Sequence, residues 1–137
     1  MHTEHHLRDE FNNAVTHGLG AFLSVIGGIV LIVLGALYGD KWQLISAIVF
    51  SVSLVGLYGA STLYHSTQEP KAKLRYKILD HCMIYVLIAG SYTPFCLITL
   101  RGPWGWSLFG IIWLLAAIGM LQEIKPRSEA RVMSLVI

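Results

Sequence analysis

The feature that most constrains this chain is the placement of its charged residues, which are confined to short segments between four long uncharged stretches. No Asp, Glu, Lys or Arg occurs in residues 11–39, 42–68, 81–100 or 102–122. A transmembrane helix needs about 20 consecutive, mainly apolar residues, and each stretch reaches that length. Only 13% of the residues are charged, whereas soluble domains average about 25%. The pattern therefore predicts a polytopic membrane protein.

Each predicted span must satisfy its own backbone hydrogen bonds, because the hydrocarbon core of a bilayer holds no water. Helices do so within one segment, and the stretches lack the alternating pattern of a barrel strand. We therefore predict an all-α membrane helix bundle with four full transmembrane helices and the start of a fifth. Pro94 is predicted to kink or end the third helix. The predicted segments are a tail at 1–12, helices at 13–38, 42–65, 78–100 and 104–121, a basic loop at 66–77 and the start of a fifth helix at 128–137.

The lysines and arginines are distributed unequally between the two ends of these helices. One end holds Lys41 and Arg101, next to Trp42, Trp104 and Trp106. The other end holds eight basic residues: Arg8, Lys71, Lys73, Arg75, Lys77, Lys125, Arg127 and Arg131. Positively charged segments stay in the cytoplasm, and tryptophans favour membrane interfaces. We therefore predict a cytoplasmic N-terminus, membrane lipids as partners and no nucleic-acid partner.

Polar and ionisable residues gather at the predicted cytoplasmic ends of three helices. Helix spacings of three, four and seven place such residues on one helix face. Ionisable residues in membrane segments usually face the bundle interior or a polar cavity. The set comprises Glu10, Asn13 and His17 on the first helix, Ser61 and His65 on the second, and Asp80 and His81 at the start of the third.

A metal-site hypothesis follows from the chemistry of this set. Neutral imidazole is a common zinc ligand, and a catalytic zinc site uses three protein ligands and a water molecule. His65 is the predicted ligand, and Asp80 would contact the metal or hold its bound water. Ser61 would hydrogen-bond that water or the imidazole of His65. The residues alone leave an alternative open, in which His65 and His81 are interfacial residues that reach the lipid headgroups.

Several motifs resemble those of the hemolysin III and progestin/adiponectin receptor superfamily, and they occur in the family's order. Residues 61–65 (STLYH) resemble its S-x-x-x-H motif. Residues 79–81 (LDH), with 88–95 (IAGSYTPF), resemble the signature of its third helix. The opening segment 10–18 (EFNNAVTHG) and the turn at 102–106 (GPWGW) are also similar.

This resemblance implies the first part of a seven-helix bundle in the bacterial inner membrane, with zinc near the cytoplasmic leaflet. It implies that His65 is a zinc ligand and that Asp80 contacts the metal through water, with Ser61 beside them as a catalytic residue. Accessory roles are implied for Glu10, Asn13, His17 and His81. The family completes its site with an H-x-x-x-H pair on the last helix, and no histidine follows His81 here. We therefore expect this chain alone to bind zinc weakly or not at all.

Three functions are compatible with these patterns. The first is hydrolysis of a lipid amide or ester by a zinc-activated water molecule. The second is a pore-forming or membrane-perturbing cytolysin, which should show a polar stripe through the full membrane depth. The third is a sensor of lipids or small molecules without turnover. Because the ionisable residues collect at one end, the sequence favours a localised site.

Overall fold

The computed structural model describes residues 2–125, except for the side chains of residues 2–4 and 6. It contains four long helices, α1 (His2–Tyr38), α2 (Lys41–Ser66), α3 (Pro70–Pro94) and α4 (Pro103–Ile124), and a π-helical segment, η1 (Phe95–Thr99), that follows α3. All four are long and apolar enough to cross a membrane, by length and composition. The predicted all-α fold with four long apolar helices is confirmed. The predicted start of a fifth helix lies outside the described residues.

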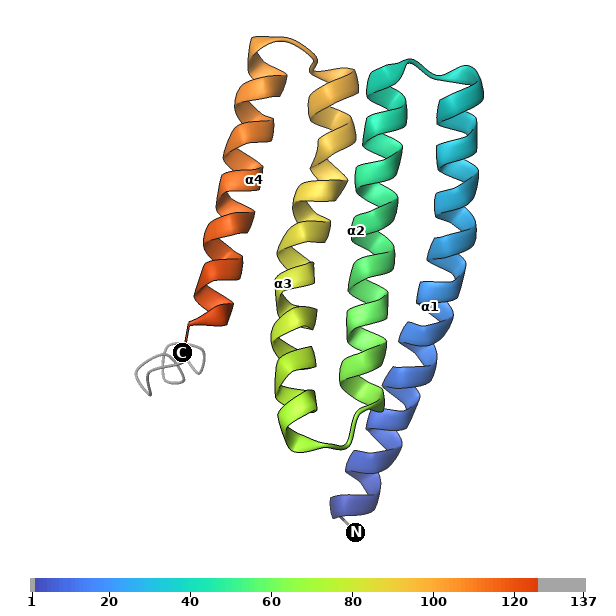
Figure 1. Ribbon diagram of the computed structural model, residues 1–137, viewed down its shortest axis with the longest axis vertical. Helices are drawn as coiled ribbons and strands as arrows, with labels where there is room; N and C mark the ends of the chain where they lie inside the picture. Colours follow the sequence, from blue (N-terminus) through green and yellow to red (C-terminus); the bar gives the residue numbers. More distant parts are fainter. Residues whose placement is uncertain (1, 126–137) are drawn as a thin grey trace.

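The four helices lie side by side in a row, in chain order (Figure 1). Among the described residues, the backbones of the long helices come close only between neighbours in sequence, so α1 and α4 lie apart. The N-terminus, the α2–α3 connection and the end of α4 share one end of the row, which we call the N-terminal end. The two short turns share the opposite end, where the rings of Trp42 and Trp106 lie 5.2 Å apart.

Small residues form the interfaces between the helices. The buried positions include Ser46, Ser53, Ala60, Ala89 and Thr93, whereas Phe22 and Leu114 are each 62% exposed. In a membrane, large apolar side chains are solvated by lipid, and small ones allow helix backbones to approach. The interfaces therefore rest on close packing, and the large apolar side chains cover the outer faces.

A glycine on α3 lies tightly against α2. A Cβ atom on Gly90 would collide with the side chain of Ser53, whose hydroxyl donates to the carbonyl of Val49 at 2.6 Å. Across the next interface, Trp113 Nε1 donates to Thr93 Oγ1 at 3.1 Å. Because Thr93 is almost fully buried, this hydrogen bond joins α3 to α4 away from water.

Two helix starts differ from the predicted bounds. Helix α1 begins at His2, so most of the predicted tail at 1–12 is helical. Helix α3 begins at Pro70, so most of the predicted basic loop at 66–77 forms its first turns. The Glu69 carboxylate accepts hydrogen bonds from the backbone amides of Lys71 (3.0 Å) and Ala72 (2.5 Å). A capping side chain followed by a proline at the first helical position favours the start of a helix. The basic residues that follow do not prevent this helix from forming, because it begins outside the hydrocarbon core.

Pro94 ends the regular part of α3, as predicted. The five residues after it form η1, because proline lacks the amide proton that an α-helical hydrogen bond requires. The chain then turns through Gly102, whose φ of 143° is accessible to glycine. Pro103 occupies the first position of α4.

Asp40 organises the opposite end of the row. Its Oδ1 accepts hydrogen bonds from the backbone amides of Trp42 (2.8 Å) and Gln43 (2.9 Å), and Arg101 Nη1 lies 3.2 Å from Oδ2. These contacts hold the pKa of Asp40 below its ordinary value, mainly through the hydrogen bond from the Gln43 backbone. The carboxylate thus caps α2 and pairs with the α3–α4 turn.

Candidate functional site

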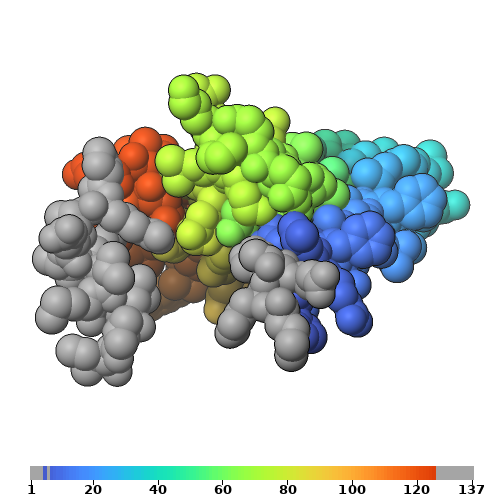
Figure 2. Space-filling view, turned by 90° about the horizontal axis from the view of Figure 1, so that it is seen from below, coloured from blue at the N-terminus to red at the C-terminus, as the bar shows by residue number. Residues whose placement is uncertain are grey.

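The predicted site residues lie at the N-terminal end. Figure 2 views this end directly: the first part of α1 lies against the α2–α3 connection, and α4 ends on the other side of α3. The residues separate into two groups, one between α1, α2 and α3, and one between α3 and α4. The sequence predicted one group at a common depth, whereas the structure divides these residues between two interfaces at one end of the row.

The first group centres on the carboxylate of Glu10 in α1. Lys73 Nζ donates to Glu10 Oε2 at 2.5 Å, and His65 Nδ1 lies 3.5 Å from the same oxygen. The side chains of Glu10 and His65 are 13% and 15% exposed. One carboxylate oxygen therefore links α1 to the end of α2 and the first turn of α3.

Lys73 is the residue of this group that the sequence did not single out as a site residue. Its Nζ also donates to the carbonyls of Tyr64 and Thr67, each at 3.3 Å, and lies 4.9 Å from the centre of the Tyr64 ring. These carbonyls belong to the end of α2, where the helix leaves acceptors unused. The sequence placed Lys73 in a basic loop, and the Glu69-Pro70 helix start was the signal that could have placed it on a helix.

His17 lies beside His65, with ring centres 5.6 Å apart. It also packs edge-on against Tyr58, with ring centres 5.9 Å apart. The Nδ1 atoms of both histidines are buried without a hydrogen-bond partner in the described structure. Buried polar atoms are nearly always paired, with protein, water or an ion. Both imidazoles therefore keep an unused nitrogen inside the helix packing.

The remaining predicted residues are arranged less closely around His65. Ser61 is buried one helical turn away from it, with 3% exposure, and Asn13 is exposed on α1. Asp80 is half-buried on α3. In residues 2–125, no hydrogen bond or ion pair joins Asp80 to His65 or Ser61, and no three His, Cys, Asp or Glu side chains lie close enough to hold a metal ion.

His81 belongs to the second group, between α3 and α4. Its Nδ1 lies 3.4 Å from Glu123 Oε2, beside a cavity of about 370 Å³ that Lys77 and Lys125 also line. Thus His81 pairs with α4, away from His65, although the two histidines lie at the same end of the row.

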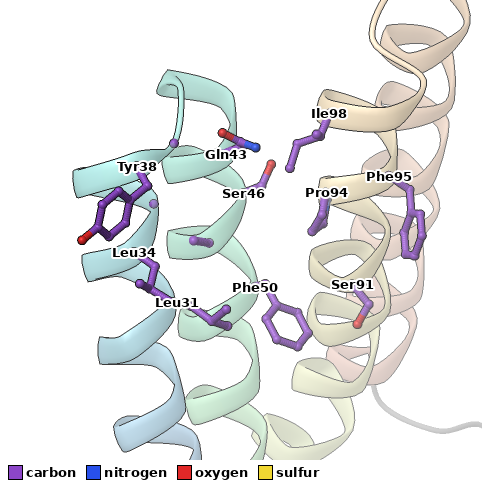
Figure 3. A pocket seen from close by; sticks show the side chains of 13 residues that line it. Leu31, Leu34, Tyr38, Gln43, Ser46, Phe50, Ser91, Pro94, Phe95 and Ile98 are labelled. Atoms are coloured by element: carbon purple, nitrogen blue, oxygen red, sulfur yellow. The ribbon is translucent and has the colours of Figure 1, made fainter.

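An apolar cavity of about 590 Å³ lies toward the opposite end, between α1, α2 and α3. Figure 3 shows Leu31, Phe50 and Ile98 around it, with the Ser46 hydroxyl at its edge. No acidic or basic residue lines this cavity. It offers room for apolar groups, whereas His17, His65 and the Glu10 carboxylate lie at the N-terminal end.

Comparisons with known proteins agree with the resemblance noted in the motifs. The family model described as "Haemolysin-III related" matches residues 5–137. "Hemolysin-3" from Bacillus cereus is 48% identical over 86% of this chain and 54% of that protein. "Hemolysin-3 homolog" from Bacillus subtilis (strain 168) is 45% identical over 86% of this chain and 55% of that protein.

A human protein, "Monocyte to macrophage differentiation factor", is 30% identical over 90% of this chain and 52% of that protein. The chain thus spans about half the length of these curated relatives. No solved structure matches it. The family match over residues 5–137, together with the four apolar helices and the motifs in family order, shows that this chain belongs to the haemolysin-III related family of multi-pass membrane proteins.

Proposed function

We propose that this sequence forms the first half of a zinc-hydrolase-like site that acts on lipid amide or ester bonds at the cytoplasmic leaflet. The observation that carries the proposal is the group at the N-terminal end, where two half-buried histidines with buried Nδ1 atoms lie side by side and one of them faces the Glu10 carboxylate. Such groups are expensive among membrane helices and mark functional sites. The excess of lysine and arginine at this end supports its cytoplasmic orientation.

His65 fits the role of a zinc ligand, because its imidazole is half-buried at the point where α1, α2 and α3 meet and is only 15% exposed. No three metal-ligating side chains come together in residues 2–125. Further ligands would therefore come from the part of the relatives that this sequence does not match. The H-x-x-x-H pair of the family pattern is the proposed source. Bound zinc would supply Lewis-acid activation of water and of a carbonyl group.

The other residues receive roles that match their places on the helices. Ser61, buried one turn from His65, would donate its hydroxyl hydrogen bond to the substrate carbonyl oxygen. Asp80, half-buried on α3, would take the proton of the attacking water on its carboxylate and return it to the leaving group. A lipid substrate would arrive sideways, because the outer helix faces carry large exposed apolar side chains.

The test uses a protein of the relatives' full length that contains this sequence. We expect the parent to hold one zinc ion per chain and to hydrolyse a short-chain ceramide in detergent micelles. His65→Ala should lose the zinc, and Asp80→Ala should keep it but lose at least about 100-fold in kcat, as expected for a lost acid–base group. His5→Ala, which alters an exposed histidine on α1, is the matched control. Equal hydrolysis by the parent and both site variants would rule out the enzyme.

The rival function is membrane permeabilisation, since two relatives carry the name hemolysin. Dye release from liposomes would rise with the parent and remain unchanged with His65→Ala and Asp80→Ala if the protein is a pore. Zinc bound without any hydrolysis or leakage would instead indicate a sensor.

A further inference from the structure

We infer that Glu10 is a positioning residue for His65: its carboxylate accepts a hydrogen bond from Nδ1–H and leaves Nε2 as the metal-binding nitrogen, while Lys73 holds Glu10 in place. This inference rests on the proposed function and extends it to Glu10, whose accessory role had no stated chemistry, and to Lys73, which had no assigned role. The three side chains come from α1, α2 and α3 and share Glu10 Oε2 as their common point.

Lys73 is anchored to the end of α2. Its ammonium donates to the carbonyls of Tyr64 and Thr67, which flank His65 in the chain. The same ammonium pairs with Glu10. Lys73 therefore ties the Glu10 carboxylate to the helix end that carries His65, so that carboxylate and imidazole are held by one backbone segment.

The tautomer of the His65 imidazole decides which ring nitrogen can bind a metal. A neutral histidine carries one N–H, and the group that accepts its hydrogen bond determines which nitrogen remains as a ligand. Metal-binding histidines usually donate their second nitrogen to a carboxylate or a backbone carbonyl. His65 Nδ1 is buried and lacks a hydrogen-bond partner, and Glu10 Oε2 lies 3.5 Å away. Such contacts are often long in ligand-free structures and shorten in the working complex.

Two other aromatic rings face His65. The Tyr64 ring centre lies 4.7 Å and the His17 ring centre 5.6 Å from that of His65. Neither contact supplies an acceptor to Nδ1, which has no hydrogen-bond partner in the part of the chain that the structure describes. Glu10 is thus the acceptor within reach, and Lys73 holds the same carboxylate oxygen in place beside the imidazole.

The test reads the tautomer of His65 directly and needs neither zinc nor activity. The 137-residue chain, with ¹⁵N-labelled histidine rings, is placed in phosphatidylcholine–phosphatidylglycerol nanodiscs with a chelator at about pH 8.5, above the ordinary titration range of histidine. His65→Ala identifies the signals. We expect the parent to be mainly the Nδ1–H tautomer and Glu10→Ala mainly the Nε2–H tautomer. An Nε2–H majority in the parent would overturn the inference.

Glu123→Gln is the matched control, because it alters the other His–Glu pair, between His81 and Glu123. It should leave the His65 signals unchanged. A shift of the His65 tautomer in this variant as large as that in Glu10→Ala would count against a specific role of Glu10.

Charge exchange separates positioning from simple helix pairing. Glu10→Lys combined with Lys73→Glu restores an ion pair between α1 and α3, so Tm should recover part of what Glu10→Lys alone loses, because a carboxylate cannot donate to the carbonyls of Tyr64 and Thr67. The acceptor beside His65 is then missing, and the tautomer should stay shifted. Recovery of both Tm and the Nδ1–H tautomer would show that the pair only joins helices. Lys73→Arg, which keeps the cation, should match the parent in both measurements.

Zinc measurements in the full-length form distinguish this inference from the proposed function. Glu10→Ala should weaken zinc binding about 10- to 100-fold, the usual effect of losing the partner of a ligand histidine. If the parent shows the Nδ1–H tautomer but no zinc, the metal function fails while the orientation of His65 by Glu10 stands. If the tautomer is Nε2–H, the inference fails whatever the zinc content.

Discussion

At the scale of single residues, the two ion-pair groups at the opposite ends of the row differ in their exposure to solvent. The Glu10, Lys73 and His65 group is nearly shielded from solvent and joins three helices. The pair of Asp40 and Arg101 is about half exposed, so its attraction is weakened by water. The first contact is a candidate for function, and the second mainly shapes the turns.

Asp40 gives a pH dependence with a defined sign. Its pKa is lowered in the folded protein, so its contribution to stability is present above the unfolded pKa of about 4 and is lost as the pH falls through the lower, folded value. Asp40→Asn keeps a good helix cap but removes the titration. We expect the parent to lose more Tm than this variant between about pH 6 and pH 3, measured by thermal denaturation in micelles. Equal losses would contradict the prediction.

The hydrogen bond between Trp113 and Thr93 is a second test at this scale. Trp113→Phe and Thr93→Val each remove one partner of the 3.1 Å contact. Hydrogen bonds between membrane helices contribute about 0.6 kcal/mol on average, so a coupling energy near that value is expected. A double-mutant cycle of unfolding in mixed micelles measures it. A coupling of zero would show that the bond adds nothing to the α3–α4 interface.

At the scale of the elements, close packing decides how the helices lie against each other. Helices α2 and α3 meet where Gly90 faces Ser53, with no room for a Cβ atom. In contrast, a Cβ atom on Gly59 of α2 would have no neighbouring atom within 4 Å. The two glycines therefore form a matched pair for testing the interface.

Gly90→Ala should destabilise the protein by about 1–3 kcal/mol, the usual cost of overpacking a tight contact. Gly59→Ala should be neutral or slightly stabilising, because alanine favours helices by about 1 kcal/mol over glycine. Unfolding in mixed micelles, followed by circular dichroism, compares the two variants. If Gly90→Ala is as stable as Gly59→Ala, the contact with Ser53 does not limit the approach of α2 and α3.

At the scale of the whole molecule, the open row of helices and the one-sided distribution of basic residues define the expected setting. Among the described residues, α1 and α4 lack contact with each other, and large apolar side chains cover the outer faces. The chain spans about half the length of its relatives. These exposed faces therefore suit lipid or further helices of the family fold.

Orientation is the prediction that belongs to this scale. Gln68→Cys and Lys41→Cys mark the two ends of the row in a background with Cys82→Ala and Cys96→Ala. A membrane-impermeant thiol reagent applied to bacterial spheroplasts should label position 41 directly and position 68 only after permeabilisation. The expectation follows from the excess of positive charge at the N-terminal end. Labelling in the reverse order would place the histidine group on the outer side.

The sequence by itself determined the four helices and the common depth of the candidate site residues. Both are local properties: hydropathy sets the length of a span, and chain direction sets which ends share a leaflet. The extra turns of α1 and α3 were missed because charged residues outside the bilayer continue a helix without an apolar signal. Glu69-Pro70 is a recognisable helix start, but the basic residues after it favoured the prediction of a loop.

Only the tertiary structure decided which of those residues touch. Helical periodicity places Glu10 and His17 on one face of α1, but it does not say how α1 is rotated against α2 and α3. That rotation depends on small side chains such as Gly90 and Ser53, whose fit is a property of two helices together. It brings Lys73 and Glu10 to His65 and directs His81 to Glu123. The uncharged stretches predicted where the chain crosses the membrane, and packing selected the contacts among the polar groups.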